Sequence, residues 1–354
     1  MTVHFVVPEG VDDALRPSGG NVYDRRLGEE LRAAGWEVRE HQVTGQLELA
    51  VVLAELPDRA TVLVDGLVAS VTEAMVGEAA RLRIVVLLHM PLAEAVGEAR
   101  VATVERAVLG AADAVVTTSQ WARRWVIVHH GLAPQRVRVA LPGVDRGPQV
   151  AGSTAGGHLL CVGPVTADKG HDVLLDALCQ VKDLEWRCTC VGALDLDPAF
   201  VDRLTATARR AGVAERVTFA GPVTQTGLEE LRSATDLVVS ASRRESFGMA
   251  VTEGLARGIP VFATEVGGHP EAVGRAADGS IPGLLVPPGD AGGLAHALRR
   301  WLTDTELRTR LRRAAAGRRT GLTTWANTAR IVSSVLNRAP LVSVSLTSEH
   351  RTDG

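Results

Sequence analysis

Short apolar segments typical of β-strands alternate with helix-like segments along most of this chain. The first strand-like run covers residues 3–7 and is followed by a helix-like stretch at 22–34, and further strand-like runs lie at 61–64, 84–88 and 114–118. Such alternation indicates parallel α/β layers, because successive parallel strands are joined by helix-length connections. The sequence therefore predicts an α/β protein.

A segment rich in glycine, proline and serine interrupts the alternation near the middle of the chain. Residues 148–157 show no hydrophobic periodicity, and the strand–helix pattern restarts at His158. At 354 residues the chain exceeds the size of one typical hydrophobic core. We therefore expect two Rossmann-like domains that face each other across a cleft, with ligands outside the carboxyl ends of the strands. The predicted organisation is a first domain at 1–147, a linker at 148–157, a second domain at 158–322, a C-terminal helix at 323–338 that packs back on the first domain, and a flexible tail at 339–354.

Composition excludes several classes of protein. A hydrophobic content of 46% with 22% charged residues is typical of a soluble globular protein, and a net charge of −3 offers no general attraction to nucleic acid or anionic membrane. The longest apolar run, at 84–88, is far shorter than the ~20 residues of a membrane span. The N-terminus is predicted as a first strand and not as a signal peptide. We expect a cytoplasmic protein without a nucleic-acid partner or an indicated membrane association.

The four cysteines, Cys161, Cys179, Cys188 and Cys190, all lie in the second predicted domain. Cys188 and Cys190 would share one face of a strand, which suits small buried hydrophobic side chains. A zinc site would need CxxC pairs or histidines at ligand spacing, and the sequence shows neither. We therefore expect structural thiols and no metal site.

Two carboxylates, Glu245 and Glu253, stand with seven residues between them where a loop is predicted to run into a helix. An apolar strand at 237–240 precedes them, and residues 258–260, Gly-Ile-Pro, end the helix. Free backbone N–H groups at such a helix start favour an anion, whereas carboxylates accept hydrogen bonds from hydroxyl groups. The pattern suits a ligand that carries both phosphate and sugar hydroxyls, such as a nucleotide sugar. The alternative is an ordinary helix residue at Glu253 and a dipole-balancing anion at Glu245.

The segment from Ser240 to Val273 resembles the signature of the retaining glycosyltransferases of family 4, which have the two-domain GT-B fold. Weaker similarities to the same family cover nearly the whole chain, although they are diffuse in the first half. The resemblance implies an acceptor-binding first domain and a nucleotide-sugar-binding second domain. The further matching segments are Ser18 to Asn21, Val115 to Ser119, Leu141 to Asp145, Gly163 to Gly170 and Gly283 to Asp290.

The resemblance implies three catalytic residues, Glu245, His89 and Lys169. Glu245 would hydrogen-bond the donor sugar, and Lys169 would pair with the diphosphate and offset the developing charge of the leaving group. Because only two of the 38 basic residues are lysines, a lysine at position 169 is more informative than usual; the alternative is a solvated surface lysine. His89 follows a strand-like run and would donate a hydrogen bond to the sugar, although a lone histidine after a strand is often structural.

The resemblance also implies a set of donor-binding residues around these three. Glu253 would bind the nucleotide ribose, roughly 8–12 Å from Glu245 along the helix. Gly19 and Gly20 would let the first glycine loop approach the diphosphate, and a simple turn is the alternative for both. The other implied donor-binding residues are Lys169, Arg244, Phe247, Gly248 and Met249; Asn21, Tyr23 and Asp24 are weaker candidates for acceptor contact, and Gly267, Gly268 and Glu271 for support of the loop behind the nucleotide.

Pro164 departs from the family pattern, which usually has an arginine at this position that contacts the phosphates. Proline has neither a charge nor a backbone N–H donor. Arg243 or Arg244 could compensate, although surface arginines beside a glutamate commonly pair with it.

The expected activity is the transfer of a sugar from a nucleoside diphosphate to an acceptor hydroxyl, with retention of configuration. The partners would be a nucleotide sugar and a small-molecule or glycan acceptor, with no cofactor and no metal. Residues 195–197, Asp-Leu-Asp, match the letters of a metal motif but follow a strand and are predicted as a turn. The alternatives are a sugar phosphorylase, a nucleotide-sugar epimerase or a non-catalytic nucleotide-sugar binder.

Overall fold

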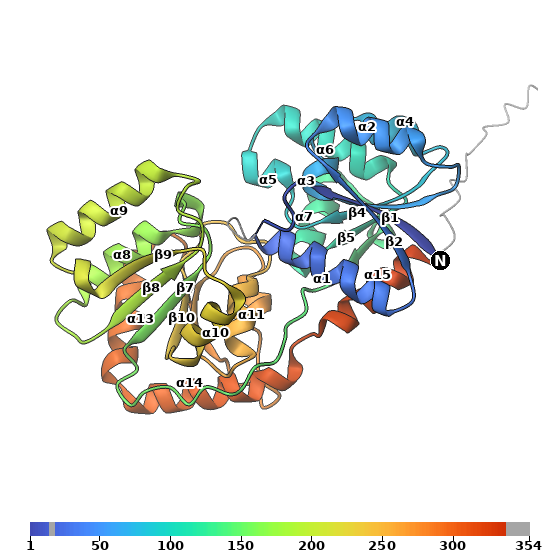
Figure 1. The fold of residues 1–354 in the computed structure, drawn as a ribbon. Helices are drawn as coiled ribbons and strands as arrows, with labels where there is room; N and C mark the ends of the chain where they lie inside the picture. Colours follow the sequence, from blue (N-terminus) through green and yellow to red (C-terminus); the bar gives the residue numbers. More distant parts are fainter. Residues whose placement is uncertain (14–17, 338–354) are drawn as a thin grey trace, which may run out of the picture.

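The computed structural model describes residues 1–13 and 18–337, so the predicted tail at 339–354 lies outside the described residues. The described residues form two α/β units, each built on a six-stranded sheet with helices around it (Figure 1). Within these same ranges, no helix is both long and apolar enough to cross a bilayer.

The first sheet has the strand order β2-β1-β3-β4-β5-β6, and all neighbouring strands are parallel. Its central strands are apolar on both faces: Val62 and Val64 of β3 belong to one core cluster, and Leu63 between them belongs to the other. This continuous burial is expected of a parallel sheet covered by helices on both sides. The strands are β1 Thr2–Pro8, β2 Glu37–Val43, β3 Thr61–Asp65, β4 Arg83–Leu88, β5 Ala114–Thr117 and β6 Val137–Val139. The helices are α1 Gly19–Ala33, α2 Gln46–Glu55, α3 Gly66–Ala69, α4 Ala74–Glu78, α5 Leu92–Val96, α6 Ala99–Ala111, α7 Gln120–His130 and the 3-10 turn Pro134–Arg136.

The second sheet repeats this architecture with the order β12-β11-β10-β7-β8-β9, again parallel throughout. Leu237 and Val239 of β10 join one core cluster, and Val238 joins the cluster on the opposite face. The strands are β7 His158–Val162, β8 Arg187–Val191, β9 Val217–Gly221, β10 Leu237–Ser240, β11 Val261–Thr264 and β12 Gly283–Val286. The helices are α8 His171–Gln180, α9 Pro198–Ala211, α10 Gln225–Ser233, α11 Met249–Leu255, α12 His269–Val273, α13 Ala291–Thr303 and α14 Thr305–Arg318, with 3-10 turns at Ala167–Lys169, Ala214–Arg216 and Arg319–Gly321.

The last helix, α15 (Trp325–Leu336), returns the chain to the first sheet (Figure 1). Trp325 joins the same core cluster as Tyr23 of α1, and the two rings meet edge to face with 5.5 Å between centroids. The Thr328 hydroxyl donates to the carbonyl of Leu141 at 2.7 Å. A Cβ at Gly143 would lie only 2.2 Å from the backbone nitrogen of Trp325, so this close crossing requires glycine. The chain therefore connects the two units at both 140–157 and 319–325.

Candidate active site

The candidate site lies where the carboxyl ends of the two sheets meet. The loop after β10 brings Arg244 to the first unit, where its guanidinium donates to the carbonyl of Ala95. A Cβ at Gly19 would lie 3.5 Å from Sδ of Met249, so the start of α1 in the first unit lies close to the start of α11 in the second. Ligands of doubly wound α/β sheets bind at this edge of the strands.

Lys169 and Glu245 form an ion pair within this region. Nζ of Lys169 lies 2.8 Å from Oε2 of Glu245, and both side chains are partly buried. Burial alone would raise the pKa of Glu245, but the Lys169 ammonium, and secondarily His269, lower it below its usual value. The ion pair thus places one fixed positive and one fixed negative charge next to each other, as a ligand with phosphate and hydroxyl groups requires.

The backbone around Glu245 is held by Gly267 and Gly268. A Cβ at Gly267, whose φ is +54°, would lie 1.8 Å from the carbonyl oxygen of Glu245, and one at Gly268 would lie 2.3 Å from that of Ser246. The Gly268 N–H also donates to the Glu245 carbonyl at 2.9 Å. These two glycines therefore support the loop behind the ion pair through backbone packing.

Gly248 begins α11 in a left-handed conformation, with a φ of +102°. A Cβ there would lie 2.7 Å from Cδ2 of the buried His269, so only glycine fits. The neighbouring Phe247 side chain is buried in a core cluster, which leaves the backbone of this residue as the part that can face a ligand. Met249 remains partly exposed beside Gly19.

Glu253 lies in α11 with its carboxylate directed to an arginine that the sequence analysis did not identify. Arg232 of α10 donates to Oε2 of Glu253, and both Arg232 and Arg257 also contact Glu229. Burial raises the pKa of Glu253, and the two arginines oppose that effect. Two buried arginines thus orient this carboxylate and keep positive charge beside it.

His89 occupies the carboxyl end of β4, between two buried carboxylates. Its Nε2 lies 2.8 Å from Oδ1 of Asp24 and 3.1 Å from Oδ2 of Asp65. Thr118 donates to the His89 carbonyl at 2.9 Å, and a Cβ at Gly20 would lie 3.3 Å from the His89 ring. Asp65 was missed by the sequence analysis, although its place directly after the strand-like run at 61–64 was a usable signal.

The charges of this Asp24–His89–Asp65 triad are strongly coupled. Burial alone would lower the pKa of His89, but the two carboxylates outweigh it and raise the pKa to about 10. Burial raises the pKa of Asp24 to about 7, and the charge of Asp65 adds to that shift. The pKa of Asp65 is lowered despite its burial, chiefly by His89. With Nε2 of His89 within hydrogen-bond distance of both carboxylates, the triad has the geometry of an ion-pair cluster.

Arg243 and Arg244, the residues considered as replacements for the missing arginine at Pro164, both have carboxylate partners. Arg243 binds Asp172 in bidentate fashion at 2.7 Å for each contact, and Arg244 binds Asp168 at 2.8 Å. Both therefore lie beside the turn that carries Lys169.

The remaining candidates differ in whether their side chains could contact a ligand. Asn21 completes the start of α1, where its N–H donates to the Ser18 hydroxyl at 3.0 Å. Tyr23 is fully buried and donates to the Ala140 carbonyl at 2.9 Å, so its side chain lies in the core and does not face an acceptor. Glu271 accepts a hydrogen bond from the Gln120 N–H at 2.7 Å and thereby links the two units.

The Asp-Leu-Asp segment at 195–197 has a structural role at its last residue. Asp197 caps α9 and accepts a hydrogen bond from the Phe200 N–H at 3.0 Å.

Two protein-family models match this chain. The description of one is "Glycosyl transferases group 1", over residues 155–318, and that of the other is "Glycosyltransferase Family 4", over residues 61–147. The chain thus resembles the family 4 glycosyltransferases in both of its units. The family resemblance predicted from the Glu245 segment is confirmed.

Curated relatives of this chain include D-inositol 3-phosphate glycosyltransferases. The protein from Mycobacterium sp. (strain JLS) is 34% identical over 205 residues, which covers 55% of this chain and 46% of the relative. The Catenulispora acidiphila protein is 34% identical over 232 residues, which covers 60% of this chain and 54% of the relative. The chain thus spans about half the length of the curated relatives that it matches.

Solved structures of GT-B proteins share this fold. Sucrose-phosphate synthase from Thermosynechococcus elongatus has a TM-score of 0.80 at 22% identity, over 95% of this chain and 98% of that chain. Anabaena Alr3699/HepE in complex with UDP-glucose has a TM-score of 0.77 at 19% identity, over 95% of this chain and 99% of that chain. The predicted fold, two Rossmann-like units of the GT-B type, is confirmed.

Proposed function

We propose that this chain transfers a sugar from a nucleoside diphosphate sugar to an acceptor hydroxyl, with retention of anomeric configuration and without a catalytic metal. The Lys169–Glu245 ion pair, at the edge where the two sheets meet, is the observation that carries the proposal. The solved Alr3699/HepE structures include a complex with UDP and glucose and a complex with UDP-glucose, which supports a nucleoside diphosphate sugar as the donor class. The acceptor we propose is a small polyhydroxylated molecule or a glycan.

The ion pair offers one group to the diphosphate of such a donor and one group to its sugar. When the diphosphate enters, the Lys169 ammonium exchanges its contact with Glu245 for a phosphate oxygen and offsets the charge that develops on the leaving group. The released Glu245 carboxylate accepts hydrogen bonds from sugar hydroxyls, and its lowered pKa keeps it ionised at neutral pH. The Glu253 carboxylate, oriented by Arg232, accepts from the ribose hydroxyls.

His89 acts as a hydrogen-bond donor from the first unit. Both carboxylates of the triad contact Nε2, so Nδ1 is the ring nitrogen that faces a ligand. With a pKa of about 10 the ring is an imidazolium at neutral pH, and its Nδ1–H donates to a hydroxyl of the transferred sugar. This role orients the sugar and does not require His89 to exchange a proton.

The transfer step needs no further base in this proposal. The bond from the anomeric carbon to the phosphate oxygen breaks as the acceptor oxygen forms its bond on the same face. The acceptor proton passes to the departing phosphate oxygen, so the nucleoside diphosphate leaves with the electron pair and the proton. Contact between the two units over the donor would exclude water and limit donor hydrolysis.

We assign the reaction to the cytoplasm as part of the same proposal. None of the four cysteines forms a disulfide, and three of them are buried. Unpaired cysteines are typical of a reducing compartment.

The direct test is release of nucleoside diphosphate from a panel of UDP-, GDP-, ADP- and TDP-sugars, with and without polyol and glycan acceptors. The expected result is acceptor-dependent release from one donor class, and a product whose anomeric configuration matches that of the donor. Inversion of configuration would contradict the retaining step. Cleavage that requires orthophosphate, turnover without an acceptor, or donor binding without turnover would identify the phosphorylase, epimerase or non-catalytic alternatives in turn.

A further inference from the structure

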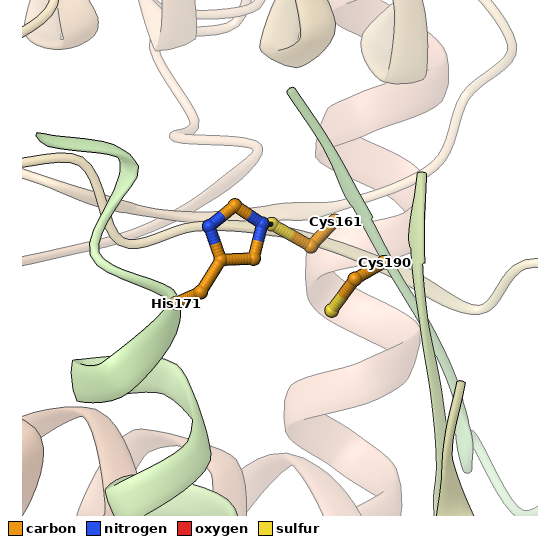
Figure 2. Close-up of side chains that lie close together, drawn as sticks. All are labelled: Cys161, His171 and Cys190. Carbon is orange, nitrogen blue, oxygen red and sulfur yellow. Dashed lines mark hydrogen bonds between the residues drawn. The ribbon is translucent and has the colours of Figure 1, made fainter. Parts of the chain in front are cut away.

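Three ligand-type side chains converge inside the second unit, beside the turn that carries Lys169. Sγ of Cys161, Sγ of Cys190 and a ring nitrogen of His171 all lie within 4.8 Å of one another. Figure 2 shows the imidazole of His171 directed at Cys161, with the Cys190 side chain on the neighbouring strand turned to the same space. All three residues are at most 3% exposed.

The fold brings these residues together from three elements. Cys161 in β7 and Cys190 in β8 are direct partners in the parallel register, so their side chains leave the sheet on the same face. His171 is the first residue of α8, which follows the turn that carries Lys169. Gly170 allows this turn, because its φ is +66° and a Cβ there would lie 1.9 Å from the Ala241 carbonyl oxygen.

The spacing between ligand atoms suits a metal ion. Sγ of Cys161 and Nε2 of His171 are 3.6 Å apart. A tetrahedral ion with metal–sulfur and metal–nitrogen distances of about 2.3 and 2.05 Å would separate these two atoms by about 3.6 Å. A thiol–imidazole hydrogen bond has a similar length, but it would not need the second thiol in register. Two thiolates and one imidazole form a soft ligand set that selects Zn²⁺ or Cu(I) over Mg²⁺ or Ca²⁺.

We propose that Cys161, Cys190 and His171 bind a thiophilic d¹⁰ cation, Zn²⁺ or Cu(I), in a buried structural site. Two thiolates and a neutral imidazole give a neutral site with Zn²⁺ and a charge of −1 with Cu(I). The nearest cation along the chain, Lys169, is paired with Glu245 at 2.8 Å. The ion replaces the thiol protons as it binds, and because the site is buried it loads as the chain folds.

This site would link two strands to the start of α8. Since Lys169 stands two residues before His171, the ion would also restrain the turn that presents the ammonium to the donor. Sequence spacing predicts no metal site, because no histidine lies near a cysteine at a usual ligand spacing. The structure brings β7, β8 and the start of α8 together, which spacing along the chain does not show. The proposed site does not depend on the identity of donor or acceptor.

The test is elemental analysis of the full chain, untagged and purified under reducing conditions from cells supplied with zinc and copper. The expected result is about one ion per chain, reduced to less than about a tenth in Cys161→Ser and in His171→Ala. Cys179→Ser is the matched control, since Cys179 is a partly exposed thiol on α8 outside the cluster. The element found distinguishes Zn²⁺ from Cu(I), and full retention of the ion by Cys161→Ser would overturn the proposal.

A measurement on the wild-type chain decides the matter if the variants do not fold. Removal of the ion with a chelator should lower the Tm by roughly 5 °C or more, and adding the same ion back should restore it. Reconstitution with Co²⁺ should produce a thiolate-to-metal absorption band. A folded wild-type chain that holds less than about a tenth of an ion, and gains neither ion nor Tm from added Zn²⁺ or Cu(I), would refute the site. Donor binding is measured separately, so failure here leaves the proposed transferase activity standing.

Discussion

Lys169 and Glu245, which are 76 positions apart in the chain, meet as an ion pair of 2.8 Å at the edge of the second sheet. Lys169 lies in the turn between β7 and α8, and Glu245 lies in the turn between β10 and α11. Each turn depends on a glycine in a conformation that other residues rarely adopt. Gly170 directly follows Lys169, and Gly267, in the loop after β11, packs against the carbonyl of Glu245. The pair unites in one place the cation and the carboxylate that a sugar diphosphate needs.

Replacement of Glu245 by glutamine should reduce turnover while the fold is retained. The neutral amide keeps the shape but loses the charged acceptor for sugar hydroxyls, and Lys169 loses its partner. We expect kcat/KM to fall by roughly 10²–10³-fold, the range typical of lost electrostatic groups in active sites. Glu265→Gln, at an exposed glutamate near the same loop, is the matched control and should behave as wild type. Equal activity of both variants would exclude a catalytic role for Glu245.

The His89 triad predicts that stability falls as the pH rises above neutrality. The pKa of His89 is about 10 in the folded chain and 6.5 as an ordinary histidine, so folding keeps a proton that the unfolded chain loses in this window. The resulting stability is fully present below pH 6.5 and is lost as the pH rises through 10, by up to about 1.4 kcal/mol per pH unit for one proton. Asp24 acts in the same direction at lower pH, because its pKa of about 7 exceeds the ordinary 3.8.

Thermal unfolding between pH 6.5 and 10 measures this effect. The Tm of the wild type should fall across the range, and His89→Gln should flatten the dependence. His296→Gln, at an exposed histidine, should leave the wild-type slope unchanged. A slope that persists in His89→Gln would show that the triad does not hold the proton.

Gly248→Ala should disturb the start of α11. The new methyl group would combine a φ of +102° with a contact of 2.7 Å to His269. We expect a loss of about 1–3 kcal/mol in the free energy of unfolding, together with weaker donor binding. Gly97→Ala is the control for the dihedral alone, because its φ is +75° and a Cβ there meets nothing within 4 Å. Equal losses in the two variants would mean that the contact with His269 adds nothing.

Arg244→Ala should weaken donor binding more than an ordinary surface arginine change would. Arg244 binds Asp168 beside the Lys169 turn and also contacts the Ala95 carbonyl of the first unit, so it can both supply positive charge and steady the two loops. Arg299→Ala is a suitable control, since Arg299 makes a bidentate surface ion pair with Asp183 and neither residue belongs to the candidate site. An unchanged donor Kd in Arg244→Ala would remove this residue as a replacement for the arginine missing at Pro164.

The fold was predictable because its signals are local. The strand segments at 62–64 and 84–88 are apolar at every position, as expected of parallel strands buried on both faces, and the turn glycines and prolines mark where the strands end. The Glu245 segment was equally readable, since one strand, one loop and one helix carry all of its residues.

The partners of the site residues were not predictable in the same way. Asp65 approaches His89 only because β3 and β4 are neighbours in the sheet, and Arg232 reaches Glu253 from α10. Nine residues separate His171 from Cys161, and this separation matches none of the usual metal-ligand spacings, although the two side chains lie together in the fold. Strand order and helix placement decide these contacts, and periodicity along the chain does not contain that information.

The most direct test of the central claim is a thermal-shift comparison of the wild type, Lys169→Ala and Lys182→Ala with UDP-, GDP-, ADP- and TDP-sugars. Lys182, the other lysine of the chain, is exposed and is the matched control. A ligand that binds only the folded chain raises its Tm by mass action. We predict that one class of nucleotide sugar raises the Tm of the wild type and of Lys182→Ala, and that the shift is lost in Lys169→Ala. A full shift in Lys169→Ala, or no shift of the wild type with any of these donors, would contradict the account.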